Sequence, residues 1–249
     1  MPRLVQKIGM LLFATTSFAV ASSLIESSSL SAQEQEQYNP PFCLGQYPNG
    51  FVKCNYDNAD NYVGYMRNGV PDGRGVYVYA DSGDRYEGEF RNGRPDGRGI
   101  YIFSDDARYT GIFQNGNIIR GTAFFADGSR YEGTFQVVTD VNSGETSSQP
   151  QGRGVFIFAN GTRYEGEFFA GDPFGKGVVR HPNGVRCDGQ FFNQNLDGKG
   201  TCTYPDGSRY EGEFRQGRPH GNGTLYSATG EVAYRGAFRE GQPGRGDNN

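Results

Sequence analysis

Pairs of glutamates two residues apart are the first residues in this chain whose types and spacing could support catalysis. The pairs are Glu87/Glu89, Glu165/Glu167 and Glu211/Glu213. Two carboxylates on one face could serve as the acid and base of a glycosidase. Each pair, however, recurs within a repeated segment, whereas a catalytic site normally departs from the pattern around it. We therefore interpret these glutamates as strand residues that face Arg98, Lys176 or an equivalent base across the sheet.

The two histidines and four cysteines lack the spacing of a catalytic or metal site. His181 stands in a His-Pro-Asn-Gly turn, and His220 replaces the aspartate of an Arg-Pro-Asp-Gly loop. Neither histidine has a nucleophile or ligand at a suitable spacing, and there is no Cys-x-x-Cys pair. The sequence predicts solvated histidines, no catalytic residue, no metal and no cofactor.

Basic residues recur in two rows. One row is Arg85, Arg108, Arg130, Arg163, Arg186 and Arg209, and the other is Arg74, Arg98, Arg153, Lys176 and Lys199. Such rows could bind lipid headgroups or an anionic polymer. Because a glutamate lies opposite or two residues along in most copies, we favour ion pairing within the sheet as their role.

The elements that position these residues are copies of one unit, Tyr86 to Phe103. Its opening motif, Tyr-Glu-Gly-Glu-Phe, recurs with small changes along the chain. Copies start at Tyr62, Tyr86, Tyr109, Tyr131, Tyr164, Cys187, Tyr210 and Tyr234, with steps of 22 to 24 residues and one longer step. Such regularity identifies a repeat array.

Each unit reads as a β-hairpin. Tyr86, Gly88 and Phe90 lie at spacing two, as do Gly97 and Gly99 after a loop predicted at 91–96, so both strands place glycines and aromatic rings on one face. The register that aligns them sets Phe90 opposite Gly97 and Gly88 opposite Gly99. The bare glycine pair is then expected to be covered by a ring from a neighbouring copy.

We expect these repeated residues to be structural. They are Tyr86, Gly88, Phe90, Gly97 and Gly99, with Tyr164, Gly166, Phe168, Tyr210, Gly212 and Phe214 in later copies. Since a lone hairpin is marginally stable, neighbouring hairpins must pair. The predicted fold is all-β: an elongated, single-layer antiparallel sheet of tandem β-hairpins with a right-handed twist.

The repeated residues resemble the MORN-repeat family, whose pattern is Tyr-x-Gly-x-(Trp/Phe)-x-x-Gly-x-x-x-Gly-x-Gly. The resemblance covers about residues 62–241, and Phe stands where Trp is common. It implies an elongated sheet that serves as a scaffold, a dimerisation element or a membrane-associated binding surface. It implies no enzymatic activity.

The flanking segments divide the chain further. Residues 1–21 contain Arg3 and Lys7, then an apolar run that ends in Ala19-Val20-Ala21, the layout of a cleavable signal peptide, with a retained signal anchor as the alternative. Residues 22–42 read as a disordered leader. Residues 43–61 read as a divergent capping repeat, with Cys54 and Tyr56 at the positions of the two later glycines. An insertion near 139–151 reads as a mobile surface loop, and 242–249 as a flexible tail.

Disulfides are expected in an exported chain. Cys187 replaces the first tyrosine of its unit and Cys202 the residue opposite, which predicts a bridge between them. Cys43 and Cys54 then remain to pair, although the predicted register does not place them opposite each other. Four cysteines allow three connectivities, so other pairings stay open.

The function predicted from these observations is non-catalytic. The formal net charge is -4, which argues against a nucleic-acid partner. We expect a secreted or periplasmic scaffold, membrane-anchored if the signal is retained, that binds a protein or cell-envelope component; a membrane-surface contact and oligomerisation remain open. The alternatives are an envelope enzyme or carbohydrate-binding subunit that uses the aromatic face as a platform, or a lipid binder at the membrane surface.

Overall fold

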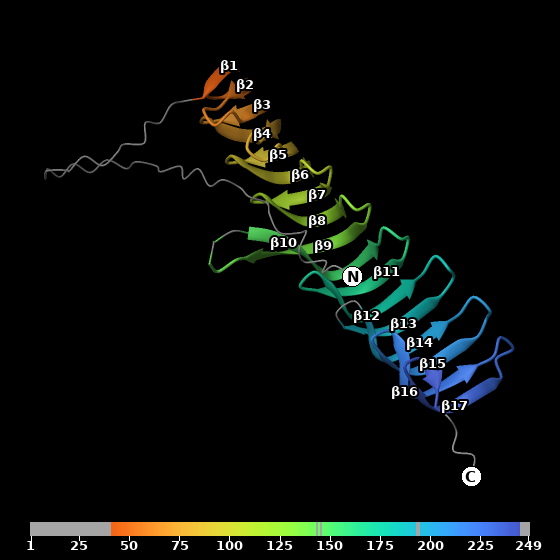
Figure 1. The fold of residues 1–249 in the computed structure, drawn as a ribbon. Coiled ribbons are helices and arrows are strands. Elements are labelled where there is room, and N and C mark those ends of the chain that lie inside the picture. Colours follow the sequence, from red (N-terminus) through yellow and green to blue (C-terminus); the bar gives the residue numbers. More distant parts are fainter. Residues whose placement is uncertain (1–40, 143, 145, 193–194, 245–249) are drawn as a thin grey trace, which may run out of the picture.

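One antiparallel sheet of 18 strands accounts for all the regular structure in the computed structural model, which describes residues 41–142, 144, 146–192 and 195–244 (Figure 1). Each strand pairs with the next along the chain. The predicted all-β fold of tandem hairpins in an elongated single sheet is confirmed.

The strands are β1 (Phe42–Gly45), β2 (Gly50–Asn55), β3 (Asn61–Arg67), β4 (Val70–Val78), β5 (Arg85–Arg91), β6 (Arg94–Ile102), β7 (Arg108–Gln114), β8 (Asn117–Phe124), β9 (Arg130–Thr139), β10 (Thr146–Ile157), β11 (Arg163–Phe169), β12 (Asp172–Arg180), β13 (Arg186–Phe192), β14 (Asn195–Thr203), β15 (Arg209–Arg215), β16 (Arg218–Tyr226), β17 (Val232–Arg239) and β18 (Gln242–Pro243). The predicted signal peptide, nearly all of the predicted leader and the end of the predicted tail lie outside the described residues. Strand β1 begins at Phe42, inside the range predicted for the leader.

A two-residue turn connects the strands of the reference hairpin, β5 and β6. Asn92 and Gly93 have φ values of 48° and 79°, and Arg91 pairs directly with Arg94. Positive φ at both central residues is what a type I′ turn requires, and Asn-Gly supplies it at little cost. The longer loop predicted at 91–96 is therefore wrong, because Arg94 to Asp96 already belong to the second strand.

A wide bulge follows this turn and changes the register. Gly88 faces Gly99 as predicted, but Phe90 faces Pro95, so Glu89 alone stands against three residues of β6. Gly97 lies in the bulge with a φ of 110°, which favours glycine, and pairs with Phe113 of the next hairpin instead. The predicted pairing of Phe90 with Gly97 is thus wrong within the hairpin; the equivalent pairing occurs between hairpins.

In five copies the first tyrosine covers the glycine pair of its own hairpin; these are the copies that begin at Tyr62, Tyr86, Tyr131, Tyr164 and Tyr210. A Cβ added to Gly99 would lie 2.2 Å from the Tyr86 hydroxyl oxygen, so only glycine leaves room for the ring. The hydroxyl donates a hydrogen bond of 3.1 Å to the carbonyl oxygen of Glu89, the residue that the bulge leaves without a direct partner on β6. The expectation that a neighbouring copy supplies the ring is therefore wrong.

Neighbouring copies are joined by edge-to-face aromatic contacts. The ring of Tyr86 lies 5.0 Å from Phe90 in its own copy and 5.1 Å from Phe113 in the next. Tyr164 makes the same two contacts, at 5.2 Å to Phe168 and 4.9 Å to Phe191. Such pairs add to the free energy gained from burying the rings. This aromatic row is the core of the molecule.

In the sixth copy a disulfide and a leucine replace the tyrosine. Cys187 and Cys202 are cross-strand partners and form a bridge. With no ring over the glycine pair, Leu196 fills the space: its Cδ1 lies 2.7 Å from the Cβ position of Gly189 and 3.1 Å from that of Gly200. Leu196 stands where the reference unit has Pro95, and it is buried.

The capping repeat is built differently from the prediction. Cys43 and Cys54 are direct partners on β1 and β2 and form the second disulfide. Gly45 faces Val52, so Val52, not Tyr56, stands at the position of the second glycine, and Cys54 lies opposite Tyr62 of the next strand. Gly45 and Val52 are 7 residues apart, whereas Gly88 and Gly99 are 11 residues apart, and this difference moves the register relative to a residue count.

Most of the insertion is strand. Thr139 pairs with Thr146, and the ladder continues inward through Ser147 and Ser148, so β9 and β10 form a long hairpin that projects from the sheet (Figure 1). Ser148 and Pro150 are buried. The predicted mobile loop over 139–151 is therefore wrong, because cross-strand pairing satisfies the extra backbone groups.

Candidate functional site

The two faces of the sheet differ in how they are used. The tyrosines, phenylalanines and glycines of the repeat point to one face, the aromatic face, where Tyr86, Tyr164, Tyr210, Phe90, Phe168 and Phe214 are buried. The other face, here called the open face, carries residues such as Glu87, Arg98 and Ile100, which the alternation of the strands directs away from the rings. Side chains free to meet a partner therefore belong mainly to the open face.

The first row of arginines on the open face is mostly paired. In these copies the arginine forms an ion pair with the acidic residue two positions later in the chain. The nitrogen–oxygen distance is 2.9 Å for Arg85–Glu87, 3.0 Å for Arg163–Glu165 and 2.7 Å for Arg186–Asp188. Arg209 contacts Glu211 in the same way. The predicted role of this row in ion pairing is supported for these four copies.

The second row of cations is aligned by the register. The cross-strand partners from β4 to β8 are, in succession, Gly75, Gly88, Gly99, Gly111 and Gly121. On every second strand, the residue just before this glycine therefore lies in line with its counterparts. These residues are Arg74, Arg98, Arg120, Arg153, Lys176 and Lys199. The sequence reasoning missed Arg120, because Ile119 replaces the glycine that precedes the cation in other copies, but alignment on Gly121 identifies it.

This second row is unpaired, contrary to the prediction. All six side chains are exposed, and none forms an ion pair with another described residue. The glutamate expected to neutralise Arg98 binds its backbone instead: Oε2 of Glu89 accepts a hydrogen bond of 3.0 Å from the Arg98 amide. Glu167 does the same for the amide of Lys176, at 3.3 Å. These carboxylates close the bulge, and the cationic side chains are left to solvent.

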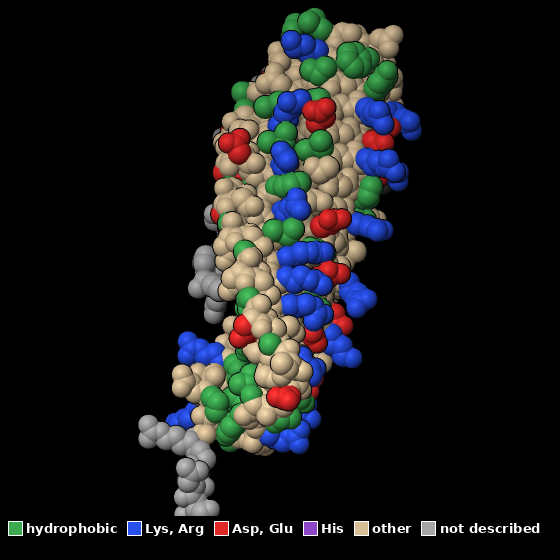
Figure 2. All heavy atoms as spheres, turned by 90° about the vertical axis from the view of Figure 1, so that its right-hand side faces the viewer, with side chains coloured by type: hydrophobic (Ala, Val, Ile, Leu, Met, Phe, Trp, Pro, Cys, Tyr) green, Lys and Arg blue, Asp and Glu red, His purple; other side chains and the backbone are tan. Residues whose placement is uncertain are grey.

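A shallow groove of about 760 Å³ lies on the open face across β2 to β7. An exposed edge-to-face pair, Phe51 and Tyr65, with ring centres 5.5 Å apart, lines one part of it. Val76, Ile100 and Ile112 add apolar surface farther along, with Arg74 and Arg98 between them. Figure 2 shows Lys and Arg side chains in a column along the elongated molecule, with hydrophobic and acidic side chains beside them.

The third copy departs from the repeat within this groove. Thr110 and Ile112 stand where the reference unit has Glu87 and Glu89. Ile112 pairs with Arg98 on one side and Arg120 on the other, so no acid faces either arginine from β7. The groove is therefore cationic and apolar where the rest of the array alternates its charges.

Three exposed phenylalanines mark another departure, which the sequence reasoning did not identify. Phe169 and Phe174 stand where the second copy has the ion pair between Arg91 and Asp96, with their rings 5.7 Å apart. Phe192 continues the row, 6.0 Å from Phe174. Comparing the copies position by position would have revealed this change from charge to apolar surface.

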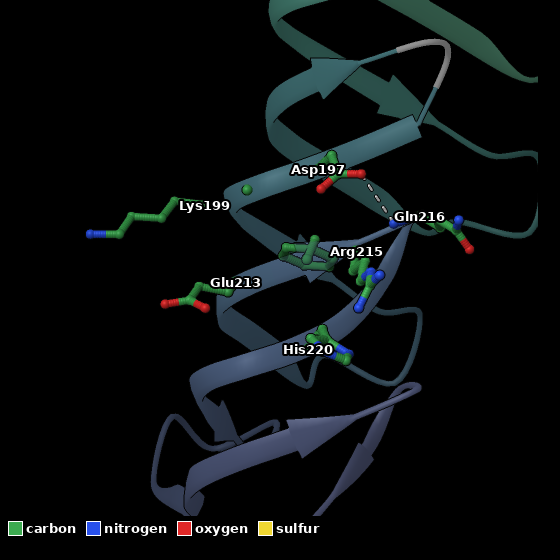
Figure 3. A pocket seen from close by; sticks show the side chains of 8 residues that line it. Asp197, Lys199, Glu213, Arg215, Gln216 and His220 are labelled. Atoms are coloured by element: carbon green, nitrogen blue, oxygen red, sulfur yellow. Dashed lines mark hydrogen bonds between the residues drawn. The ribbon is translucent and has the colours of Figure 1, made fainter.

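A pocket of about 420 Å³ between β14 and β16 contains the most varied polar groups (Figure 3). Asp197 accepts a hydrogen bond of 3.5 Å from the backbone amide of Gln216, while Lys199 and Glu213, which also line the pocket, point away from Asp197 and His220. His220 lines it from strand β16 and is partly buried, so the prediction that His220 is a solvated loop residue is wrong. No hydrogen bond joins His220 to Asp197 or another described side chain, so the pocket lacks the linked acid, base and nucleophile of a hydrolase.

Other titratable groups serve packing. Nδ1 of His181, which is exposed, lies 3.2 Å from the Thr162 hydroxyl. Burial raises the pKa of the core tyrosines, and a hydrogen bond from Tyr101 to Asp84 raises the pKa of that hydroxyl further. Within the described residues, no group of three or more His, Cys, Asp or Glu could hold a metal ion, and no helix is long and apolar enough to cross a membrane.

Comparison with solved structures finds distant similarity to TCP domains. One is the TCP10 domain of Danio rerio CPAP in complex with a peptide of STIL, with 19% identity, a TM-score of 0.36, and coverage of 76% of this chain and 84% of that chain. Another is the TCP domain of Drosophila melanogaster SAS-4 in complex with a proline-rich motif of Ana2, with 11% identity, a TM-score of 0.42, and coverage of 74% and 96%. A search of curated proteins found no match.

The family comparison agrees with the hairpin units seen in the structure. The model of the MORN repeat matches residues 62–83, 86–108, 148–163, 164–186, 187–209 and 210–232. Residues 109–147, which contain the third copy and β9, the first strand of the long hairpin, lie between the second and third matches. Because the matched segments cover more than half of the chain and each falls on hairpins of the same sheet, this protein belongs to the MORN-repeat family.

Proposed function

We propose that this protein is an exported, non-catalytic binding module that holds a protein partner on its open face. The observation that supports this proposal is that the two faces differ in which side chains they leave accessible. The rings of the aromatic face are buried against one another, whereas the open face has unpaired cations and exposed apolar side chains in one groove. Apolar anchors among polar groups are typical of a surface that binds protein.

Burial of the rings counts against the carbohydrate-platform alternative. Tyr86 and Tyr131 are fully buried and Phe168 is 3% exposed, so a sugar could not stack on them without opening the core. A lipid surface remains an alternative for the cation row, because headgroups would also neutralise it. The exposed Phe51, Tyr65 and Ile100 in the same groove favour a partner with side chains of its own.

Export is supported by the amino-terminal sequence and by the disulfides. Residues 1–21 have the three-part layout of a signal peptide, and cleavage after Ala21 would remove Arg3 and Lys7 and bring the net charge from -4 to -6. Two disulfides are compatible with an extracellular or periplasmic location. Amino-terminal sequencing of secreted material should give Ser22; an intact Met1 found only in membranes would mean a signal anchor.

Site-specific photo-crosslinking in the native host tests the binding proposal. A crosslinking amino acid at Ile100, on the open face, should give a discrete protein adduct that mass spectrometry can identify. The matched control is Asp105, an exposed residue in the connection after the same strand. Adducts of equal yield at both positions, or adducts to lipid alone at Ile100, would overturn the proposal.

A further inference from the structure

We infer that the groove across β2 to β7, together with Arg120 on the adjoining strand β8, binds a polyproline II segment of a protein partner that carries a carboxylate at every third residue. This inference rests on the proposed function and specifies the partner's chemistry. Three independent features of the groove support it: the spacing of its cations, the state of its acids and the nature of its apolar surface.

The spacing follows from the register. Arg74, Arg98 and Arg120 lie in line on alternate strands, β4, β6 and β8. Since adjacent strands are about 4.7–4.9 Å apart, successive cations are separated by about 9.4–9.8 Å. A ligand that engages all three must present acidic groups on one side with nearly this period.

Few backbone conformations provide that period. A polyproline II helix has three residues per turn and rises about 3.1 Å per residue, so every third side chain faces the same way at about 9.3 Å. A β-strand places side chains on one face at multiples of about 6.6 Å. An α-helix returns to the same face after seven residues, at about 10.5 Å, which loses register over successive cations. The polyproline II period fits the row best.

The acids of the groove are already engaged, whereas its cations are not. Glu87 pairs with Arg85 at 2.9 Å, and Glu89 binds the Arg98 amide. Between Arg98 and Arg120 the strand in the middle carries Ile112 instead of an acid. Glu89 keeps its charge and is the cross-strand partner of Arg74, but three guanidinium groups against this one carboxylate leave the row with net positive charge, which carboxylates of a ligand would complement.

The apolar surface suits the remaining two residues of each turn. Tyr65 is 52% exposed and stands edge-on to Phe51, while Ile100 is 37% exposed beside Arg98. Proline-rich segments dock against exposed aromatic and aliphatic side chains, and they lose little conformational entropy because their helix is preformed. The groove crosses β2 to β7, a span of about 24 Å, which accommodates seven or eight residues at about 3.1 Å each.

Defined peptides test the inference with the full mature chain. Acetylated (Pro-Pro-Glu)4 should bind in fluorescence anisotropy at low salt. A peptide of the same composition with its four glutamates in one block should bind more weakly, and (Pro-Pro-Lys)4 should not bind. Equal affinity for the spaced and blocked glutamate peptides would overturn the spacing argument.

Exposed substitutions test the residues. Arg74→Gln and Arg98→Gln should each weaken the spaced peptide about 2- to 5-fold, the range of single exposed charge pairs. Arg209→Gln is the matched control, because Arg209 already pairs with Glu211 at the far end of the array and should leave affinity unchanged. Ile112→Glu restores the residue that the second copy has at this position, and it should also weaken binding.

The outcomes separate the inference from the proposed function. If Ile100 crosslinks to a protein but none of the peptides binds, the function stands and the inference fails. If anionic phosphatidylglycerol vesicles bind in an Arg98-dependent manner while the peptides do not, a lipid surface replaces the peptide and the inference is likewise overturned.

Discussion

Truncating Phe168 tests whether aromatic packing between copies stabilises the array. Phe168 is 3% exposed, and its ring lies 4.9 Å from Tyr131 of the preceding copy and 5.2 Å from Tyr164 of its own. Replacement by alanine removes both edge-to-face contacts at once. It also leaves a space that the sheet, held by pairing on both sides, cannot easily close.

The expected loss is large for a single side chain. Burying a phenylalanine contributes roughly 1.5–3 kcal/mol, and each aromatic pair adds about 0.5–1.5 kcal/mol. Phe→Ala replacements in cores cost about 3–5 kcal/mol, which agrees with that sum. For a chain of this length, each kcal/mol lowers the melting temperature by about 2–4 °C, so Phe168→Ala should lower it by roughly 6–20 °C.

The neighbouring residue provides the matched control. Phe169 is 59% exposed on the open face, and Phe169→Ala should change stability by less than about 1 kcal/mol. Thermal and urea unfolding, followed by far-UV circular dichroism and tyrosine fluorescence, would compare the two variants. Equal losses, or a larger loss for Phe169→Ala, would falsify the assignment of the two faces.

Three further predictions concern the glycines, the tyrosines and the second disulfide. Gly99→Ala should cost about 1–3 kcal/mol in urea unfolding, because its Cβ would lie 2.2 Å from the Tyr86 hydroxyl oxygen; an unchanged midpoint would contradict this packing. Burial raises the pKa of Tyr210 to about 12, whereas tyrosines of the unfolded chain have pKa values near 10 and ionise first as the pH rises. The free energy of unfolding should therefore be unchanged below about pH 10 and fall above it. In a titration followed by tyrosinate absorbance, Tyr210→Phe should remove one late-titrating group. Replacing Cys187 and Cys202 together by alanine should cost roughly 3 kcal/mol for a bridge with a sequence separation of 15, and non-reducing peptide mapping that joined either cysteine to Cys43 would contradict the pairing.

The sequence predicted the fold because one pattern, repeated many times, restricts the structure more than any single copy can. The spacing of Tyr86, Gly88 and Gly99 sufficed to infer hairpins, their glycine pairing and the bridge between Cys187 and Cys202. The turn was misplaced for a physical reason. The spacing of two residues between Pro95, Gly97 and Gly99 is the same with or without a bulge, so this spacing cannot reveal that the bulge shifts the pairing of β6 with β5. The Asn-Gly pair at 92–93 was the local signal for the shorter turn.

The candidate site was less predictable, because it depends on which partner each charge meets. Counting residues placed Glu89 opposite Arg98, and the structure does bring them together, but through the amide and not the guanidinium. The difference arises from the bulge, which leaves that amide in need of an acceptor. Phe51 belongs to the divergent capping repeat, where the pattern gives no position to compare, whereas Tyr65 stands where the reference unit has Glu89, so comparison of the copies would have revealed it.

The replacement of a tyrosine by Cys187 has a consequence for how this sequence can change. Over the glycine pair of the sixth copy, Leu196 occupies the volume that a ring fills elsewhere, and its Cδ1 lies 2.7 Å from the Cβ position of Gly189. Restoring tyrosine at 187 alone would place two side chains in one space, while restoring proline at 196 alone would leave the glycines uncovered. Positions 187 and 196 therefore share one space, so a change in side-chain volume at either position alters what fits at the other.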